Sequence, residues 1–302
     1  MKTSVVISTY NGERFIIEEL ESILHQTQLP DEVLLFDDQS SDNTVSLIKS
    51  FIEDNALSSW RIQVNAVNKG WKRNFMEGIK EATGDIVFIA DQDDIWVKDK
   101  VSIMTSKMYN NPEILLLVSD FIKFKDDDTV NTVLQEEKGS LSKADMNQSF
   151  LAVNYPGCTY CVRKSFLDNI FSDWVPEFAH DSYLWKCAVV RDGAYVLSKP
   201  LILWRKHDDS TFSIEKKEQS DRTSRYDGLL LQKKYLSVLD SQGDILNAGR
   251  EIIREYSIFT ERRMKFYDTK NPLLGLKLLF SVNKYRDFKQ YLSDWASVYI
   301  RK

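Results

Sequence analysis

The sequence predicts an α/β fold, in which a mostly parallel sheet carries helices on both faces and a mainly helical C-terminal region follows. In the first 120 residues, short β-prone apolar runs alternate with segments of helical apolar spacing. From about Ser224 to Lys302 the spacing is mainly helical. Strands separated by helices of about 10–15 residues form βαβ units, which need a sheet buried on both faces.

The elements of the first half follow a regular order. Strands are expected at 3–9, 31–38, 60–67 and 85–91, and helices at 14–26, 42–54 and 71–82. Asp42 is the expected N-cap of the second helix, because Asp accepts hydrogen bonds from the first backbone N–H groups of a helix. Since crossovers in such sheets are right-handed, the strands' C-terminal ends share one edge, where ligands of open α/β sheets bind.

The pattern is looser after residue 120. We expect a hairpin or mobile surface excursion at 120–140, a strand and helix start at 156–166, a helix at 180–190 and a strand-rich segment at 193–207. Cys158 and Cys161 form a single C-x-x-C, which favours core or strand thiols over a metal or redox site.

Composition and charge exclude several classes of protein. The chain has 302 residues, 43% of them apolar, and a net charge of -5, whereas a nucleic-acid binder would be basic. No apolar run approaches the roughly 18 residues that suggest a membrane span. The N-terminal "MKTSVVISTYNG" lacks the apolar segment and cleavage site of a signal peptide, so a cytoplasmic protein is the simplest interpretation.

Polar loops follow all four expected strands: "STYNG", "DDQSSDNT", "NKG" and "DQDD". Each alone is better explained as a turn, since Asn, Gly, Asp and Ser favour turns. Four such loops at one edge, two of them with adjacent carboxylates, favour a binding site.

The loop "DQDD" crowds Asp91, Asp93 and Asp94 into four positions. Acids also favour helix starts, which could explain Asp93 and Asp94 but not Asp91, so close to a buried strand. Mg²⁺ or Mn²⁺ would neutralise the cluster, and such cations use one or two protein carboxylates and leave positions for substrate phosphates. The loop therefore predicts a metal-assisted diphosphate site.

Four stretches occur in an order and spacing that resembles family-2 glycosyltransferases over about residues 3–210: "VVISTYNGERFIIEELESILHQT", "VLLFDDQSSDNT", "NKGWKRNFMEGIKEATGDIVFIADQDDIW" and "HDSYLW". The resemblance implies a GT-A type, Rossmann-like catalytic domain at 1–215, with a nucleotide-sugar half to about 120 and an acceptor half after it. Residues 216–302 would be a helical region. "DQDDIW" and "WRKHDDST" are most similar to bacterial polysaccharide enzymes, including rhamnosyltransferase-like members.

The family's activity is the expectation for this chain. It is metal-dependent, inverting transfer of a sugar from a nucleotide-sugar, UDP- or dTDP-linked, to a growing surface polysaccharide or lipid-linked glycan. One alternative is a sugar-phosphate nucleotidyltransferase, but "STYNGERF" offers no Gly-rich basic phosphate loop. Another is a non-catalytic nucleotide- or glycan-binding module, against which "DQDD" and "HD" argue.

The resemblance also implies roles for single residues. Asp38 would accept a hydrogen bond from the pyrimidine base, and Asp91 would approach the ribose. Asp93 would bind the metal, and His207 would ligate it or touch the diphosphate. The remaining expected nucleotide-sugar contacts are Ser8, Thr9, Asn11, Asn68 and Arg73.

Two further residues, both in "WRKHDDST", concern the same site. Arg205 could compensate phosphate charge. Ser210 stands where the family pattern often has Asn.

Asp181, in "HDSYLW", matches the family's general base, which removes the acceptor hydroxyl's proton. Its alternative role is as the N-cap of the following helix. His180 is either a packing residue at the helix start or an acceptor contact.

The tail from Arg262 mixes basic with aromatic and apolar residues. Such helical segments can lie in a membrane interface, where basic side chains meet anionic headgroups. We expect peripheral contact with the inner face of a membrane; a cap on the catalytic domain or a homodimer contact is the alternative. The basic residues are Arg262, Arg263, Lys265, Lys270, Lys277, Lys284, Arg286, Lys289, Arg301 and Lys302.

Overall fold

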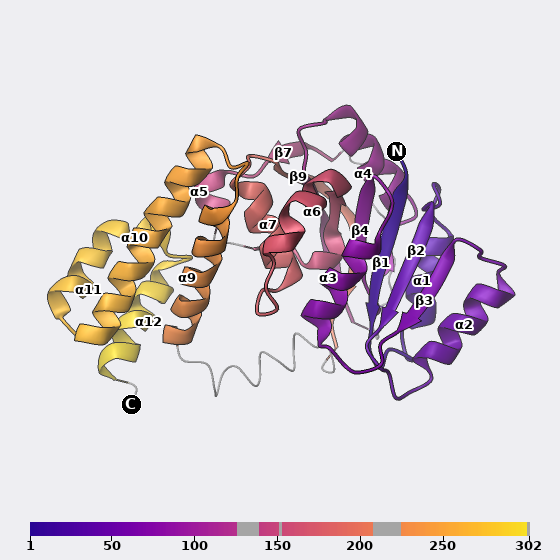
Figure 1. Cartoon of the computed structure of the whole chain (residues 1–302), viewed down its shortest axis with the longest axis horizontal. Coiled ribbons are helices and arrows are strands. Elements are labelled where there is room, and N and C mark those ends of the chain that lie inside the picture. Colours follow the sequence, from indigo (N-terminus) through magenta and orange to yellow (C-terminus); the bar gives the residue numbers. More distant parts are fainter. Residues whose placement is uncertain (126–138, 151–152, 208–224, 301–302) are drawn as a thin grey trace. The chain divides into compact units, whose positions relative to one another are not determined.

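The computed structural model describes residues 1–125, 139–150, 153–207 and 225–300 (Figure 1). The chain forms two compact units. The first comprises Met1–Ala144, Val153–Ala188 and Gly193–His207, and the second Asp145–Ala152, Val189–Asp192 and Asp208–Lys302. Ser210, Arg301 and Lys302 lie outside the described residues, as does the middle of the excursion expected at 120–140.

Four parallel strands form one half of the sheet in the first unit, in the order β3-β2-β1-β4 (Figure 1). They are β1 (Thr3–Thr9), β2 (Glu32–Asp37), β3 (Trp60–Val64) and β4 (Ile86–Asp91). The register places Ser8 beside Asp91 and Thr9 beside Asp37. The C-terminal ends of these strands therefore share one edge, as the sequence predicts.

Helices cover both faces of this parallel half. Helices α1 (Ile16–Leu24) and α2 (Thr44–Asp54) join the core that contains Val5 and Val33. Helix α3 (Trp71–Glu81) packs on the opposite face, where a Cβ on Gly78 would come within 2.9 Å of Val6. Because successive side chains of a strand point to opposite faces, Val5 and Val6 mark the two faces.

The expected N-cap of α2 is wrong. Asn43 occupies the cap position, and Asp42 lies one residue earlier. The Asp42 carboxylate still accepts a hydrogen bond from Thr44 N, at 3.0 Å, and another from Glu13 N, at 3.1 Å. It thus closes a turn before the helix and ties that turn to the loop after β1.

The rest of the sheet is mixed. Strand β8 (Tyr160–Arg163) lies between β4 and β6 (Leu116–Phe124) and is antiparallel to both. Strand β9 (Ala194–Arg205) is parallel to β6 and antiparallel to β5 (Ile95–Trp96) and β7 (Leu141–Lys143).

Short helical segments connect these strands: α4 (Lys100–Asn110), η1 (Gly157–Thr159), α6 (Lys164–Ile170), η2 (Phe171–Asp173) and α7 (His180–Val189).

The second unit is mainly helical, as predicted. Its elements are α5 (Met146–Ser149), α9 (Arg225–Ser241), α10 (Asn247–Thr269), α11 (Pro272–Leu278), η3 (Leu279–Lys284) and α12 (Phe288–Tyr299). Among the described residues, none of the helices combines the length and apolar character needed to cross a membrane.

A buried ion pair joins α10 to α12. Arg263, 3% exposed, donates to both carboxylate oxygens of Asp294, at 2.8 and 2.9 Å. The hydroxyls of Tyr267 and Tyr285 donate to the same carboxylate, at 2.9 and 3.0 Å. Arg263, one of the basic residues of the tail, is therefore a core residue of this unit.

Candidate active site

Gln92 locks the acidic loop after β4 to the loop after β1. Its side chain accepts a hydrogen bond from Tyr10 N at 2.8 Å and donates one to Tyr10 O at 3.0 Å. The Gln92 amide also fills the space where Gly12 lacks a side chain, so a Cβ there would clash. The sequence interpretation missed Gln92, because its partner is backbone from a distant loop.

The expected pocket residues Ser8, Thr9 and Asn11 lie at the shared strand edge, and their polar groups connect the loops. Thr9 Oγ1 donates to Asp37 Oδ2 at 2.9 Å, and Ser8 Oγ accepts from Asn74 Nδ2 at 2.8 Å. Asn11 Oδ1 accepts from the backbone N of residue 41 at 2.8 Å, and its φ of 48° is left-handed.

Asp38 is 2% exposed and organises the loop after β3. Its carboxylate accepts hydrogen bonds from Lys69 N and Gly70 N, both at 2.8 Å, and from Asn65 Nδ2 at 2.9 Å. A carboxylate has about four acceptor positions, so about one remains for a ligand.

Asn68 and Arg73, the expected nucleotide-sugar contacts after β3, flank Gly70. Asn68 Oδ1 accepts from Gly70 N at 3.0 Å. The Arg73 side chain is 47% exposed and lies 3.9 Å from the Glu77 carboxylate.

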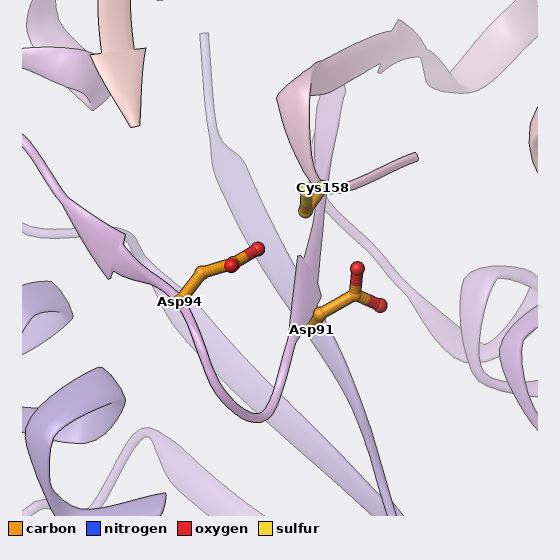
Figure 2. A group of neighbouring side chains, drawn as sticks. All are labelled: Asp91, Asp94 and Cys158. Carbon is orange, nitrogen blue, oxygen red and sulfur yellow. The ribbon is translucent and has the colours of Figure 1, made fainter. Parts of the chain in front are cut away.

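Asp91, Asp94 and Cys158 form a cluster whose ligand atoms all lie within 4.8 Å of one another. Figure 2 shows the two carboxylates on the two arms of the acidic turn, with Cys158 on a neighbouring segment. Asp91 is half-buried, whereas Asp94 and Cys158 are fully buried. The sequence interpretation did not bring Cys158 to this site.

Burial and mutual repulsion shift the titration of this cluster. Burial, followed by the charge of Asp93, raises the pKa of Asp91 to about 7, and the same two causes raise the pKa of Asp94. Burial also raises the pKa of the Cys158 thiol, which therefore stays neutral and can donate a weak hydrogen bond. A neutral thiol beside carboxylates is not a soft-metal site; oxygen ligands suit Mg²⁺ or Mn²⁺.

A second layer of buried charge lies under the acidic loop. Glu19 is fully buried, and burial followed by the Asp94 charge raises its pKa. Lys100, also fully buried, donates to Cys158 O at 2.6 Å, and its Nζ lies 3.7 Å from the Trp96 ring centroid. Burial lowers the pKa of Lys100 to about 8.

The two expected metal ligands are in direct contact. His207 Nε2 lies 2.6 Å from Asp93 Oδ2. Arg205 Nε donates to Asp93 O at 2.7 Å, and Arg205 also pairs with Glu18. An oxygen and a nitrogen donor thus meet beside Asp91 and Asp94, whose pKa values are raised by burial and then by repulsion, an arrangement that fits a divalent cation.

Phe15 and Phe124 hold the Arg205 guanidinium between them, with ring centroids 4.7 and 4.6 Å from its central carbon. The backbone N of Arg205 donates to Asp94 Oδ1 at 3.0 Å. Arg205 therefore fixes the end of β9 against the acidic loop.

Asp181 lies in the first turn of α7, but it is not the N-cap. Tyr183 N donates to Ala179 O at 2.9 Å, which makes residue 179 the cap, and Asp181 Oδ1 accepts from its neighbour Ser182 N. After burial and the Asp93 charge, the Asp181 charge also contributes to the raised pKa of Asp91.

His180 has a packing role. It is 4% exposed, and its ring centroid lies 4.2 Å from that of Phe75. A Cβ on Gly157 would clash with its Nε2. Burial lowers the pKa of His180, so the ring stays neutral.

Comparisons with known proteins identify a matching family model and sequence relatives. Residues 4–171 match the family model described as glycosyl transferase family 2. The chain is 30% identical over 227 residues to the dTDP-rhamnosyl transferase RfbG of Shigella flexneri, covering 68% of this chain and 72% of that one. It is 29% identical over 184 residues to the Escherichia coli UDP-Glc:alpha-D-GlcNAc-diphosphoundecaprenol beta-1,3-glucosyltransferase WfgD, covering 60% of this chain and 67% of the relative.

Solved structures show a similar fold. S. aureus TarS 1–349 in complex with UDP-GlcNAc has a TM-score of 0.65 at 19% identity, covering 97% of this chain and 81% of TarS 1–349. Mannosyltransferase PcManGT from Pyrobaculum calidifontis, in complex with GDP-Man and Mn²⁺, has a TM-score of 0.57 at 15% identity, covering 98% and 84%. These likenesses confirm the predicted fold class, a GT-A type α/β sheet followed by a helical region.

Proposed function

The chain belongs to glycosyl transferase family 2, as its motifs predict, and we propose that it is an inverting, metal-dependent glycosyltransferase. The observation that carries the proposal is the contact between Asp93 and His207, next to the cluster of Asp91, Asp94 and Cys158. We assign catalysis to residues 1–215, with the donor half in 1–120 and the acceptor half in 121–215, followed by the helical region 216–302.

Asp93 and His207 are the proposed ligands of Mg²⁺ or Mn²⁺. Their donor atoms already converge, and a cation would replace the 2.6 Å contact between them. When bound, such a cation stabilises the negative charge that develops on the departing diphosphate. Arg205 keeps Asp93 in place through the bond to its carbonyl. The Mn²⁺ complex of the Pyrobaculum mannosyltransferase supports the choice of metal.

The donor is a nucleotide-sugar held along the loops after β1, β2 and β3. We assign the nucleotide pocket to Ser8, Thr9 and Asn11, with Asp91 at the ribose. Asp38 offers its remaining acceptor position to the base. Asn68 and Arg73 lie near the diphosphate-sugar. RfbG and WfgD are named for dTDP- and UDP-linked donors, which supports a pyrimidine nucleotide.

Asp181 is the proposed general base. Its carboxylate takes the proton from the acceptor hydroxyl as that oxygen attacks the anomeric carbon. The bond from the anomeric carbon to the diphosphate oxygen breaks, and the electron pair leaves with the nucleoside diphosphate. A single displacement of this kind inverts the anomeric centre. Two observations support the assignment. Asp181 lies on the first turn of α7, and its charge contributes to the raised pKa of Asp91.

The acceptor is a growing surface polysaccharide or a lipid-linked glycan. WfgD is named for a diphosphoundecaprenol-linked acceptor, which supports the second class.

A donor panel tests the proposal. Purified protein is mixed with dTDP-rhamnose, UDP-glucose or UDP-GlcNAc, in Mn²⁺, Mg²⁺ or EDTA, and its thermal unfolding is measured. A ligand that binds only the folded state stabilises it by mass action, so one donor should raise Tm only with metal. Release of nucleoside diphosphate from that donor, when a glycan acceptor is added, identifies a transferase. Conversion of the donor and added pyrophosphate to a nucleoside triphosphate and a sugar 1-phosphate would instead identify a nucleotidyltransferase, and binding without either turnover would identify a binding module.

A further inference from the structure

The second unit carries an exposed apolar stripe along α11 and the first residues of η3. Leu273, Leu276 and Phe280 are 64%, 53% and 90% exposed. Together with exposed Lys277, they occupy positions i, i+3, i+4 and i+7, which share one side of a helix. Gly275 and Leu278, on the other side, are buried. Both sides of this segment are thus apolar, although only one packs against the protein.

Helix α12 carries a second such stripe. Phe288, Leu292 and Tyr299 are 54%, 50% and 48% exposed. At about 100° per residue they lie within roughly 40° of one another around the helix axis. Its neighbouring side packs on α11, where Tyr291 donates to Gly275 O at 3.2 Å and Trp295 fills the space above Gly275. The two stripes therefore lie on helices that touch.

Within residues 270–300, which carry these stripes, basic side chains outnumber acidic ones. Exposed bases in the same stretch are Lys270, Lys277, Arg286 and Lys289. The two acids of this stretch are already engaged: Asp294 is buried with Arg263, and Asp287 accepts from Gln290 N at 2.8 Å and pairs with Arg286 at 3.2 Å.

The two stripes together are called the α11–α12 face, which comprises Leu273, Leu276, Phe280, Phe288, Leu292 and Tyr299. We propose that the α11–α12 face binds the surface of an anionic lipid bilayer. The apolar side chains would enter the headgroup and acyl boundary, and the lysines would meet anionic headgroups, as in interfacial amphipathic helices. A second copy of the chain is a less suitable partner for this face than an anionic bilayer. A two-fold contact places a face against itself, so the lysines would approach their own counterparts. The proposal does not depend on the chemistry at the sheet edge.

Vesicle co-sedimentation of the full chain tests it. The vesicles are phosphatidylcholine, alone or mixed with phosphatidylglycerol, and no donor or acceptor is added. Binding should need phosphatidylglycerol and weaken with salt. Leu276→Ser with Phe280→Ser should weaken the vesicle partition by at least about tenfold, because burial of each large apolar side chain is lost. Lys277→Gln with Lys289→Gln should weaken it by roughly fivefold per lysine.

Leu29→Ser with Tyr109→Ser is the matched control. These side chains are 57% and 71% exposed but belong to the first unit. The control should bind vesicles like the parent, and circular dichroism should show all variants folded. Absence of vesicle binding by the folded parent would overturn the proposal. So would equal loss in the control, or a dimer in sedimentation velocity that the Leu276 and Phe280 changes dissociate without affecting vesicle binding.

Discussion

His207 Nε2 and Asp93 Oδ2 lie 2.6 Å apart, although 114 positions separate them in the sequence. Asp93 follows β4, whereas His207 follows β9. The contact therefore depends on β9 ending at the acidic loop, where the Arg205 backbone N donates to Asp94 at 3.0 Å. The pairing of β9 with β5, which begins two residues after Asp93, thus brings two distant parts of the chain into one site.

Asp93→Ala should abolish transfer and remove most metal-dependent donor binding, because it deletes the oxygen ligand opposed to His207. Calorimetric titration with the donor, with and without Mn²⁺, measures the effect. Asp99→Ala, an acid six positions along at the start of α4, should retain metal dependence. Unchanged metal dependence in the Asp93 variant would contradict the ligand assignment.

Asp38→Ala should weaken donor binding more than it slows the bound reaction, because a base contact is made equally in the ground and transition states. It also removes an acceptor from Lys69 N, while Gly70 N keeps Asn68 Oδ1 and Asn65 Nδ2 keeps Asn74 Oδ1. We therefore expect a loss of stability of about 1–3 kcal/mol from the lost acceptor of Lys69 N. Steady-state kinetics and thermal unfolding check both effects. A constant donor KM with a collapsed kcat would argue against the base contact.

Asp181→Asn should give a folded protein with near-normal donor Kd. Transfer should fall by about 10²–10⁴-fold, the usual loss for a general base. The amide keeps the size of the carboxylate but cannot take the acceptor proton. Donor Kd and single-turnover transfer are measured side by side. Transfer within a few-fold of the parent would mean that the base lies elsewhere.

Gly157→Ala should lower both stability and transfer. The added Cβ would clash with His180 Nε2, and overpacking of this kind costs about 1–3 kcal/mol. Because His180 precedes Asp181, the first turn of α7 should shift. Gly228→Ala is the control, since its Cβ would meet nothing within 4 Å, and it should be neutral or stabilising by up to about 1 kcal/mol. Equal kcat in both variants would refute the positioning effect.

The metal-free protein should lose stability as pH rises from about 4 to about 7. The folded pKa of Asp91 is about 7, above its ordinary 3.8, so in this window the folded state holds a proton that the unfolded state has released. One such proton changes the unfolding free energy by about 1.4 kcal/mol per pH unit. Tm measured against pH in EDTA should show this slope, and Asp91→Asn should flatten it. An unchanged slope would exclude Asp91 as its source.

Local sequence patterns predicted the strands and helices that form the strand edge, because β-prone runs and helical spacing report directly whether a segment is a strand or a helix. The exact ends of the strands were less predictable. The third strand ends at Val64 rather than at residue 67, because Asn65 turns inward to bond Asp38 and Asn74.

The buried layer beneath the acidic loop was not predicted. Lys100 and Cys158 meet there only because β8 inserts antiparallel between β4 and β6, a pairing that no local pattern encodes. The burial of Glu19, in contrast, could have been predicted from its position in the sequence. This residue lies on the apolar stripe of α1 with Ile16, Leu20 and Ile23, and all four are buried.

The buried thiols have a practical consequence. The chain's three cysteines, Cys158, Cys161 and Cys187, are all free and buried, and burial raises the pKa of the first two. Since the thiolate is the reactive form, maleimides should react slowly with the folded protein. A cysteine introduced by Phe280→Cys, at a position 90% exposed, would then be labelled selectively. A polarity-sensitive fluorophore there would report contact of the α11–α12 face with its surroundings in a single cuvette.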